Sequence, residues 1–222
     1  MKRILILSLF VVFITGCANP AQIKEPILAD LSNDLWQQKT LSYQVNYAQP
    51  TPGIFTGGDV VELQPIRNVS KSIYSSKILS TLDDHIKTNI PNNIKFIEDS
   101  KSSDYRMEID LIAFHKKGPA YSDYLDLANW TKFFLTLSMN YVHDYDIIAD
   151  YKLNCRLYDK NDNLIHENGY KVKDVLEHEE YKYNITSSDD ILASALFKKH
   201  ISININNFFK ELEKQSSNIA NL

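Results

Sequence analysis

Hydrophobic residues recur at helical spacing in two parts of the chain. Between residues 70 and 90 an apolar residue stands at every fourth position from Ile78 to Ile90, which predicts an amphipathic helix capped by Ser70 or Ser72. A second helix is predicted from about residue 187 to Lys214. Its apolar face consists of Phe197, Ile201, Ile205, Phe208 and Leu212.

Other segments alternate apolar and polar residues, as a half-buried strand does. The alternation is clearest in residues 105–114 and 147–158. The turn residues 159–163 then connect the second of these to residues 164–175, so these two segments are predicted to form a hairpin. Two shorter strands are predicted, at 59–66 and 94–97, where the letters read DVVELQPI and IKFI.

The order of these elements defines the fold class. It predicts an α+β domain over residues 59–214, with a mixed or antiparallel sheet and two main helices packed on one face. Residues 17–58 contain four of the seven prolines and an alternating segment, LSYQVNY, and are predicted to be a tether that can dock in part on the domain. Residues 215–222 are predicted to be a polar tail.

The first residues carry the marks of an export signal. Lys2 and Arg3 precede an apolar run of about 11 residues, which is too short to span a bilayer but suits a signal peptide. Ile14-Thr15-Gly16-Cys17 follows, and it resembles the lipobox of bacterial lipoproteins. The alternative is a simple N-terminal membrane anchor with an incidental cysteine.

The resemblance implies a set of covalent modifications. The signal peptide, residues 1–16, would be removed, and Cys17 would receive diacylglycerol and an N-acyl chain, which together anchor a protein stably. No other cofactor is expected. Ala18 resembles the pattern of outer-membrane lipoproteins, so we expect a periplasm-facing outer-membrane location in preference to the inner membrane.

Charge and cysteine content narrow the functions further. The formal net charge is −4, and removing Lys2 and Arg3 leaves 24 − 2 = 22 basic residues against 28 acidic ones. An acidic chain of this kind is not expected to bind nucleic acid. Cys155 is the second of two cysteines and lies in a predicted strand, which favours a buried apolar role over a reactive thiol.

Residues 116–146 form an apolar insertion between predicted strands. A helix there would gather Trp130, Phe133, Phe134 and Leu137 on one side. That side is either part of the core or an exposed contact for a membrane or a protein partner.

We predict no metal site and no catalytic residues. His143-Asp144-Tyr145-Asp146 matches no ligand motif and is expected to be a loop, while His178-Glu179-Glu180 is expected to be a solvated charge run. Four other histidines show no partner in the sequence: His85, His115, His166 and His200. The motifs of serine hydrolases and nucleotide-binding proteins are absent.

Three stretches carry a second, broader resemblance. They are SKILSTLDDHIKTNI, SSDYRMEIDLIAF and YKLNCRLYDKNDNLIHENGYKV. Together with the lipobox they resemble small periplasmic α/β lipoproteins of the curli-secretion type. This resemblance implies a role in envelope assembly or secretion and transfers no catalytic residues.

These observations favour a membrane-anchored, non-enzymatic binding or assembly factor of the cell envelope, with an envelope protein as partner. One alternative is an envelope enzyme acting on peptidoglycan or glycan through Asp123, Asp126, Asp144 and Asp146. Another is a carrier of a lipid or other small apolar ligand. Converging carboxylates in a cleft would favour the enzyme, and a deep apolar pocket would favour the carrier.

Overall fold

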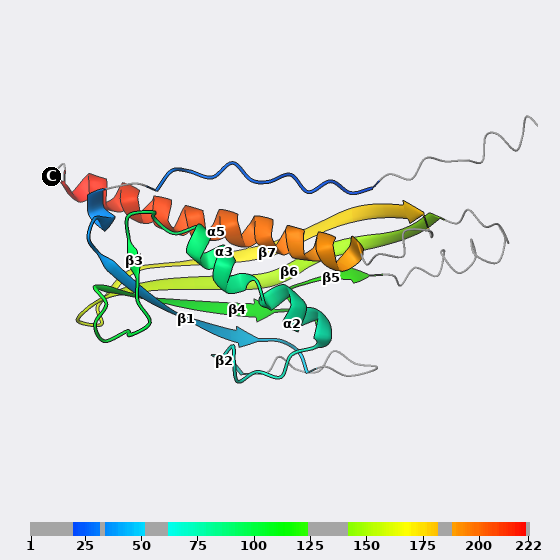
Figure 1. Ribbon diagram of the computed structural model, residues 1–222, viewed down its shortest axis with the longest axis horizontal. Coiled ribbons are helices and arrows are strands. Elements are labelled where there is room, and N and C mark those ends of the chain that lie inside the picture. Colours follow the sequence, from blue (N-terminus) through cyan, green and yellow to red (C-terminus); the bar gives the residue numbers. More distant parts are fainter. Residues whose placement is uncertain (1–19, 32–33, 52–61, 124–141, 182–187, 221–222) are drawn as a thin grey trace, which may run out of the picture.

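The computed structural model describes residues 20–31, 34–51, 62–123, 142–181 and 188–220. These residues form an open, mixed sheet of seven strands with helices packed on one of its faces (Figure 1). The α+β class predicted from the sequence is therefore confirmed.

The sheet is built around two neighbouring long strands. β6 (Val142–Asp159) and β7 (Leu164–Tyr181) pair antiparallel along their whole length. On its other side β6 pairs first with β5 (Ala120–Asp123) and further along with β4 (Tyr105–Ala113). β4 in turn pairs in parallel with β1 (Thr40–Ala48).

Two very short strands pair with the edge of β1 that lies away from β4. β2 (Gln64–Pro65) pairs antiparallel with its second half, and β3 (Lys95–Phe96) pairs in parallel with its beginning. Both lie within or next to the strands predicted at 59–66 and 94–97, although residues 52–61 are outside the described part of the chain.

Within the described residues, four helical segments accompany the sheet. α5 (Ser188–Ala220) is the longest, and it runs along the sheet beside α2 (Ile73–Leu79) and α3 (Leu82–Thr88) (Figure 1). A short 3-10 helix, η1 (Asp34–Trp36), precedes β1. α5 continues to Ala220, through residues 215–220 of the segment predicted to be a polar tail.

The helix predicted between residues 72 and 90 is divided into α2 and α3. Ser72 caps α2 as expected, its side chain accepting a hydrogen bond from the Ser75 amide. At the break, the hydroxyls of Ser80 and Thr81 donate to the carbonyls three residues before them. Such side-chain bonds compete with the helical backbone bonds, which accounts for the break at this point.

The core lies between the helices and the sheet. The apolar residues of β4 that alternate from Met107 to Ala113 are fully buried, as the strand pattern predicted. The five residues of the predicted α5 face are buried in the same core cluster. The apolar stripe from Ile78 to Ile90 is also buried, so both predicted helix faces are confirmed.

Residues 40–48 belong to the sheet and not to a tether. β1 pairs with β4 from Leu41 to Ala48, and both Leu41 and Tyr47 are fully buried. The folded domain therefore begins before residue 59, the boundary predicted from the sequence. The alternation of this segment was visible, but its pairing with a strand 64 residues later was not.

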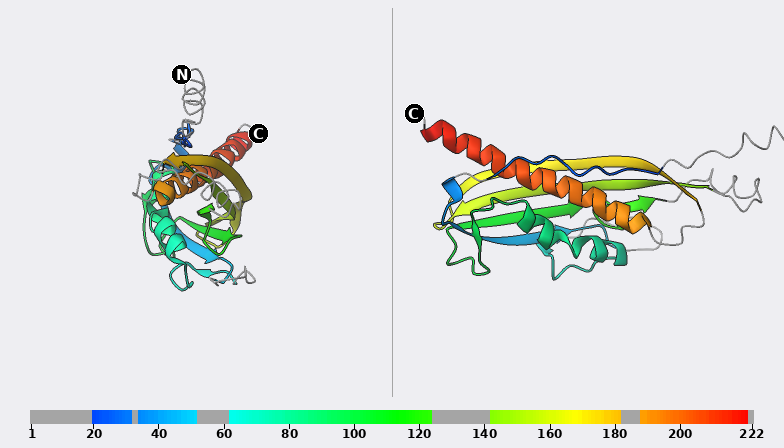
Figure 2. Two further views of the ribbon diagram at one scale, coloured as in Figure 1. Left: turned by 90° about the vertical axis from the view of Figure 1, so that its right-hand side faces the viewer. Right: turned by 45° about the horizontal axis from the view of Figure 1, so that its top comes forward.

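Residues 20–31, which we call the strap, lie extended along α5 and β7 (Figures 1 and 2). Ala29 exchanges two hydrogen bonds of 2.9 Å with the side chain of Asn206 in α5. Glu25 forms a 2.8 Å ion pair with Lys198, and Leu31 is buried. This part of the predicted tether is thus docked on the domain.

The predicted loop at His143–Asp146 and the predicted charge run at His178–Glu180 both lie in strands. They belong to β6 and β7 respectively, so the hairpin is longer than the sequence suggested. The residues of the predicted lipobox, from Ile14 to Cys17, lie outside the described residues. So do four residues of the apolar insertion: Trp130, Phe133, Phe134 and Leu137.

Candidate functional site

An open groove of about 560 Å³ lies between α3 and the free edge of β1. Three elements supply its walls, since β1, α3 and the segment that begins with β3 approach one another here. The groove is lined by Tyr43, Asp83, Lys87, Phe96, Ile97 and Glu98.

Two aromatic rings form the apolar part of the groove. Tyr43 points from β1 toward the helix side of the sheet, and Phe96 stands beside it on β3. Their ring centroids are 5.4 Å apart with an interplanar angle of 80°. Edge-to-face pairs of this kind are favourable and hold both rings in fixed positions. Both side chains are only partly buried, so they are open to a bound molecule.

Charged side chains surround these rings. The Asp83 carboxylate accepts hydrogen bonds from the Tyr43 hydroxyl and from Lys87 Nζ, the latter at 2.6 Å. Burial and the neighbouring Asp83 raise the pKa of Tyr43 above its usual range. Partial burial alone would raise the pKa of Asp83, but the bonds from Lys87 and Tyr43 lower it overall. With Glu98, the lining carries two acids and one base.

The backbone at the groove offers a short open sheet edge. β3 pairs with Thr40 and Leu41, and β2 pairs with Asn46 and Tyr47. Within the described residues, the stretch of β1 between these pairs has no strand partner on this side. The carbonyls of Leu41 and Val45 accept bonds from the flanking segments, so the intervening Tyr43 presents its N–H and C=O at this edge.

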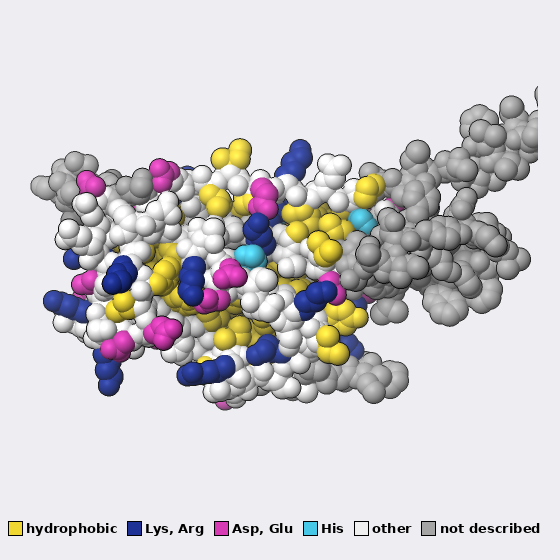
Figure 3. Space-filling model, in the orientation of Figure 1, with side chains coloured by type: hydrophobic (Ala, Val, Ile, Leu, Met, Phe, Trp, Pro, Cys, Tyr) yellow, Lys and Arg dark blue, Asp and Glu magenta, His cyan; other side chains and the backbone are white. Residues whose placement is uncertain are grey.

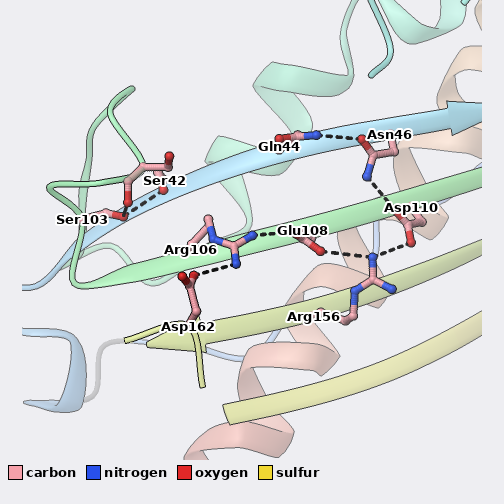
Figure 4. Close-up of polar contacts among 10 residues, drawn as sticks. Ser42, Gln44, Asn46, Ser103, Arg106, Glu108, Asp110, Arg156 and Asp162 are labelled. Carbon is pink, nitrogen blue, oxygen red and sulfur yellow. Dashed lines mark hydrogen bonds and ion pairs between the residues drawn. The ribbon is translucent and has the colours of Figure 1, made fainter. Parts of the chain in front are cut away.

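On the opposite face of the sheet, a row of ion pairs connects neighbouring strands (Figure 4). Arg106 of β4 pairs with Glu108 and lies 2.9 Å from Asp162, while Arg156 of β6 lies 2.7 Å from Asp110 and 3.2 Å from Glu108. The Asn46 side chain extends the row to β1 by donating to Asp110 at 2.8 Å.

This row of ion pairs links three strands in their observed register. Asp110 is nearly buried, and its partners Arg156 and Asn46 satisfy its carboxylate. Because each charge already faces an opposite charge, the row offers less to a ligand than the groove does. We therefore regard it as a structural feature and the groove as the candidate site.

The structure also places the carboxylates considered for an enzyme. Asp123 of β5 stands opposite Asp146 of β6, and Lys117 Nζ lies 3.8 Å from Asp123. Asp144 lies two residues before Asp146 in β6, while Asp126 is outside the described residues. Among the residues described, no group of three or more His, Cys, Asp or Glu side chains could hold a metal ion.

Several histidines have partners that were not visible in the sequence. His200 of α5 forms a 2.8 Å hydrogen bond with Asp174 of β7. His115 stacks on Tyr121, with ring centroids 4.0 Å apart. His178 is buried, and its Nδ1 accepts a hydrogen bond of 3.0 Å from the amide of Ala21 in the strap. It is therefore no part of a solvated charge run.

Cys155 is a free and fully buried thiol. Burial, together with the negative charge of Asp110, raises its pKa well above the usual range. The thiolate form is therefore disfavoured, and the apolar role predicted for this residue is confirmed.

Comparison with known proteins assigns no family. No family model matches the chain, and no curated protein matches it. A solved structure of a DUF330 protein from Xanthomonas campestris is similar, with 16% identity, a TM-score of 0.41, and coverage of 89% of this chain and 99% of that one. The rare lipoprotein B from Shewanella oneidensis has 12% identity, a TM-score of 0.26, and coverage of 82% and 97%. These values are low, so we carry over neither family nor function.

Sequence reasoning did not find the groove. Tyr43 was assigned to a tether, and Phe96 to a short strand without a function. The only available signal was the pair of aromatic residues within two alternating segments, LSYQVNY and IKFI. No motif joins these segments, since they are brought together only by the parallel pairing of β1 and β3.

Proposed function

We propose that this protein is a lipoprotein of the bacterial outer membrane that acts without catalysis, by binding an extended segment of an envelope protein in the groove beside Tyr43. The open edge of β1 is the observation that carries the proposal. A peptide added at such an edge gains main-chain hydrogen bonds, while side-chain pockets select its sequence.

The chemistry of the groove indicates the kind of segment it would accept. Only Tyr43 offers both backbone groups, so the added strand would be short. An apolar side chain of the segment could contact the Phe96 ring, and a basic one could approach Glu98 and Asp83. A small rigid groove of mixed polarity suits such a peptide better than a lipid chain, which needs a deeper apolar cavity.

The anchor can be tested independently of the groove. Cells that express the protein should incorporate labelled palmitate into it, because the proposed acyl chains are attached at Cys17. The Cys17→Ser variant should incorporate none and should not be retained in the membrane fraction. Equal labelling of wild type and variant would contradict acylation at Cys17.

A photo-crosslinking amino acid at position 96 tests the groove in living cells. We expect it to yield one discrete crosslinked species, because the Phe96 ring would face the bound segment. The matched control places the same amino acid at Phe114, which is 41% exposed and does not line the groove. Crosslinking at position 114 should not give this species.

A charge change in the groove provides the second control. Lys87→Glu leaves an exposed side chain exposed but makes the lining strongly acidic, and it should change the crosslinking yield at position 96. Lys101→Glu makes the same charge change at an exposed residue outside the groove lining and should leave the yield as it was. Identical species from positions 96 and 114, or no effect of Lys87→Glu, would argue against the groove.

A further inference from the structure

The docked strap restricts where the membrane can lie relative to the domain. Ala21 is held against His178 by a 3.0 Å hydrogen bond, and only residues 18–20 separate it from Cys17. A fully extended chain spans at most about 3.6 Å per residue, so Cys17 lies within about 14 Å of Ala21. If residues 17–58 were a free tether, the domain could stand much further from its lipid.

His178 marks one particular end of the molecule. It stands opposite Tyr145, three residues from the end of the hairpin at which Val142 pairs with Tyr181. The described chain begins, α5 begins and β5 ends on this same side (Figures 1 and 2). The anchored residue is therefore tied to this end of the molecule, and the turn between β6 and β7 lies at the other.

Near the anchored end, a small surface carries large apolar side chains in contact with water. Ile73 is 87% exposed on α2 and Ile191 is 66% exposed in the first turns of α5, with Tyr74 beside Ile73. The 2.7 Å ion pair between Lys77 and Asp190 holds these two helices together. On the face seen in Figure 3, hydrophobic side chains reach the end that adjoins the grey residues.

We infer that this surface, formed by Ile73, Tyr74 and Ile191, rests on the bilayer that holds the acylated Cys17. The inference rests on the acylation proposed above. Exposed apolar residues beside a lipid anchor add buried area in the headgroup region, and tyrosine is enriched at that depth. The Lys77–Asp190 pair balances its own charge, so it does not oppose the contact.

This placement also directs the groove away from the lipid. Through Met107 of β4, Tyr43 is in register with Leu157 of β6. His178 is in register with Tyr145, much nearer the start of β6. From residue 145 to residue 157 of β6 the rise is about 3.4 Å per residue, or roughly 40 Å. The groove is therefore presented to partners well above the membrane surface.

An environment-sensitive probe at single cysteines tests the inference. The acylated protein is reconstituted in vesicles of phosphatidylethanolamine and phosphatidylglycerol, with Cys155→Ala removing the buried thiol. Ile73→Cys and Ile191→Cys each carry a nitrobenzoxadiazole probe. The matched control is Asn161→Cys, which is exposed in the turn between β6 and β7.

Probes at positions 73 and 191 should shift to shorter emission wavelengths in vesicles and be quenched by brominated lipid, while the probe at 161 should do neither. Equal responses at all three positions would overturn the inference, as would unshielded probes at 73 and 191 in a protein that does incorporate palmitate. In the latter case the anchor would stand and only this surface would fail. If shielding instead appears in the soluble Cys17→Ser form as its concentration rises, the surface joins two copies and the inference is wrong.

Discussion

His166 illustrates how a single buried side chain links stability to pH. Its ring packs 4.8 Å from that of Phe208, and its Nε2 lies 3.8 Å from the Glu211 carboxylate. Burial lowers the pKa of His166, and Glu211 offsets this only in part. The folded state therefore favours the neutral imidazole.

The sign of the pH effect follows from this shift. In the unfolded chain a histidine has a pKa of about 6.5, so below that pH the unfolded state binds more protons than the folded state. We expect the free energy of unfolding to decrease as the pH falls below about 6.5, and to vary little with His166 above it. Urea unfolding midpoints measured between about pH 5 and pH 8 check this.

A phenylalanine substitution isolates the contribution of His166. His166→Phe keeps a ring against Phe208 but cannot take up a proton, so its unfolding midpoint should depend less on pH than that of the wild type. Some dependence should persist, because burial also lowers the pKa of His85 and of His115. Parallel profiles for wild type and His166→Phe would show that His166 does not titrate differently on folding.

Single residues were predictable where their own segment determined their environment. Cys155 alternates with Leu153 and Leu157, so its burial could be inferred from the four residues around it. The contact between Tyr43 and Phe96 could not, because it depends on the pairing of two distant strands. The same is true of His200 and Asp174, which meet only when α5 packs on β7.

At the scale of elements, the sequence predicted the type of each helix or strand better than its length or its pairing partner. The strands at 105–114 and 147–158 and both buried helix faces were found because apolar periodicity reflects burial directly. The hairpin was predicted too short, since its outer parts contain charged residues such as Glu177 and Glu179. Pairing between the two strands satisfies their backbones there, so a strong apolar pattern is not required.

The role of β1 shows a second limit. Its letters alternate clearly, yet four nearby prolines suggested a tether. What makes it a core strand is its parallel pairing with β4, and parallel strands need a long connection that hides their relationship in the sequence. The groove could not be predicted for the same reason, because it is formed at the edge of β1.

At the scale of the whole molecule, the segment before β1 is part of the fold. Trp36 of η1 is almost fully buried, with its ring 5.7 Å from that of Tyr105 and 5.4 Å from that of Phe209. Its Nε1 also donates a 2.9 Å hydrogen bond to Glu213. The strap and η1 thus bind along α5 and close the core at one end of the sheet.

Three soluble forms of the protein would measure these contributions, one beginning at Pro20, one at Asp34 and one at Lys39. The form beginning at Asp34 lacks the strap and with it buried Leu31, so its free energy of unfolding should be lower by about 2–5 kcal/mol. The form beginning at Lys39 also lacks Trp36 and should lose about 3–5 kcal/mol more.

Urea unfolding of the three forms gives these differences directly. A spacer would make no contribution to stability, so equal midpoints for all three would mean that residues 20–38 do not hold to the domain in solution. A loss only on removal of η1 would mean that the strap is weakly held. In that case the short reach between Cys17 and the domain would no longer follow, because the anchor could swing away on a free segment.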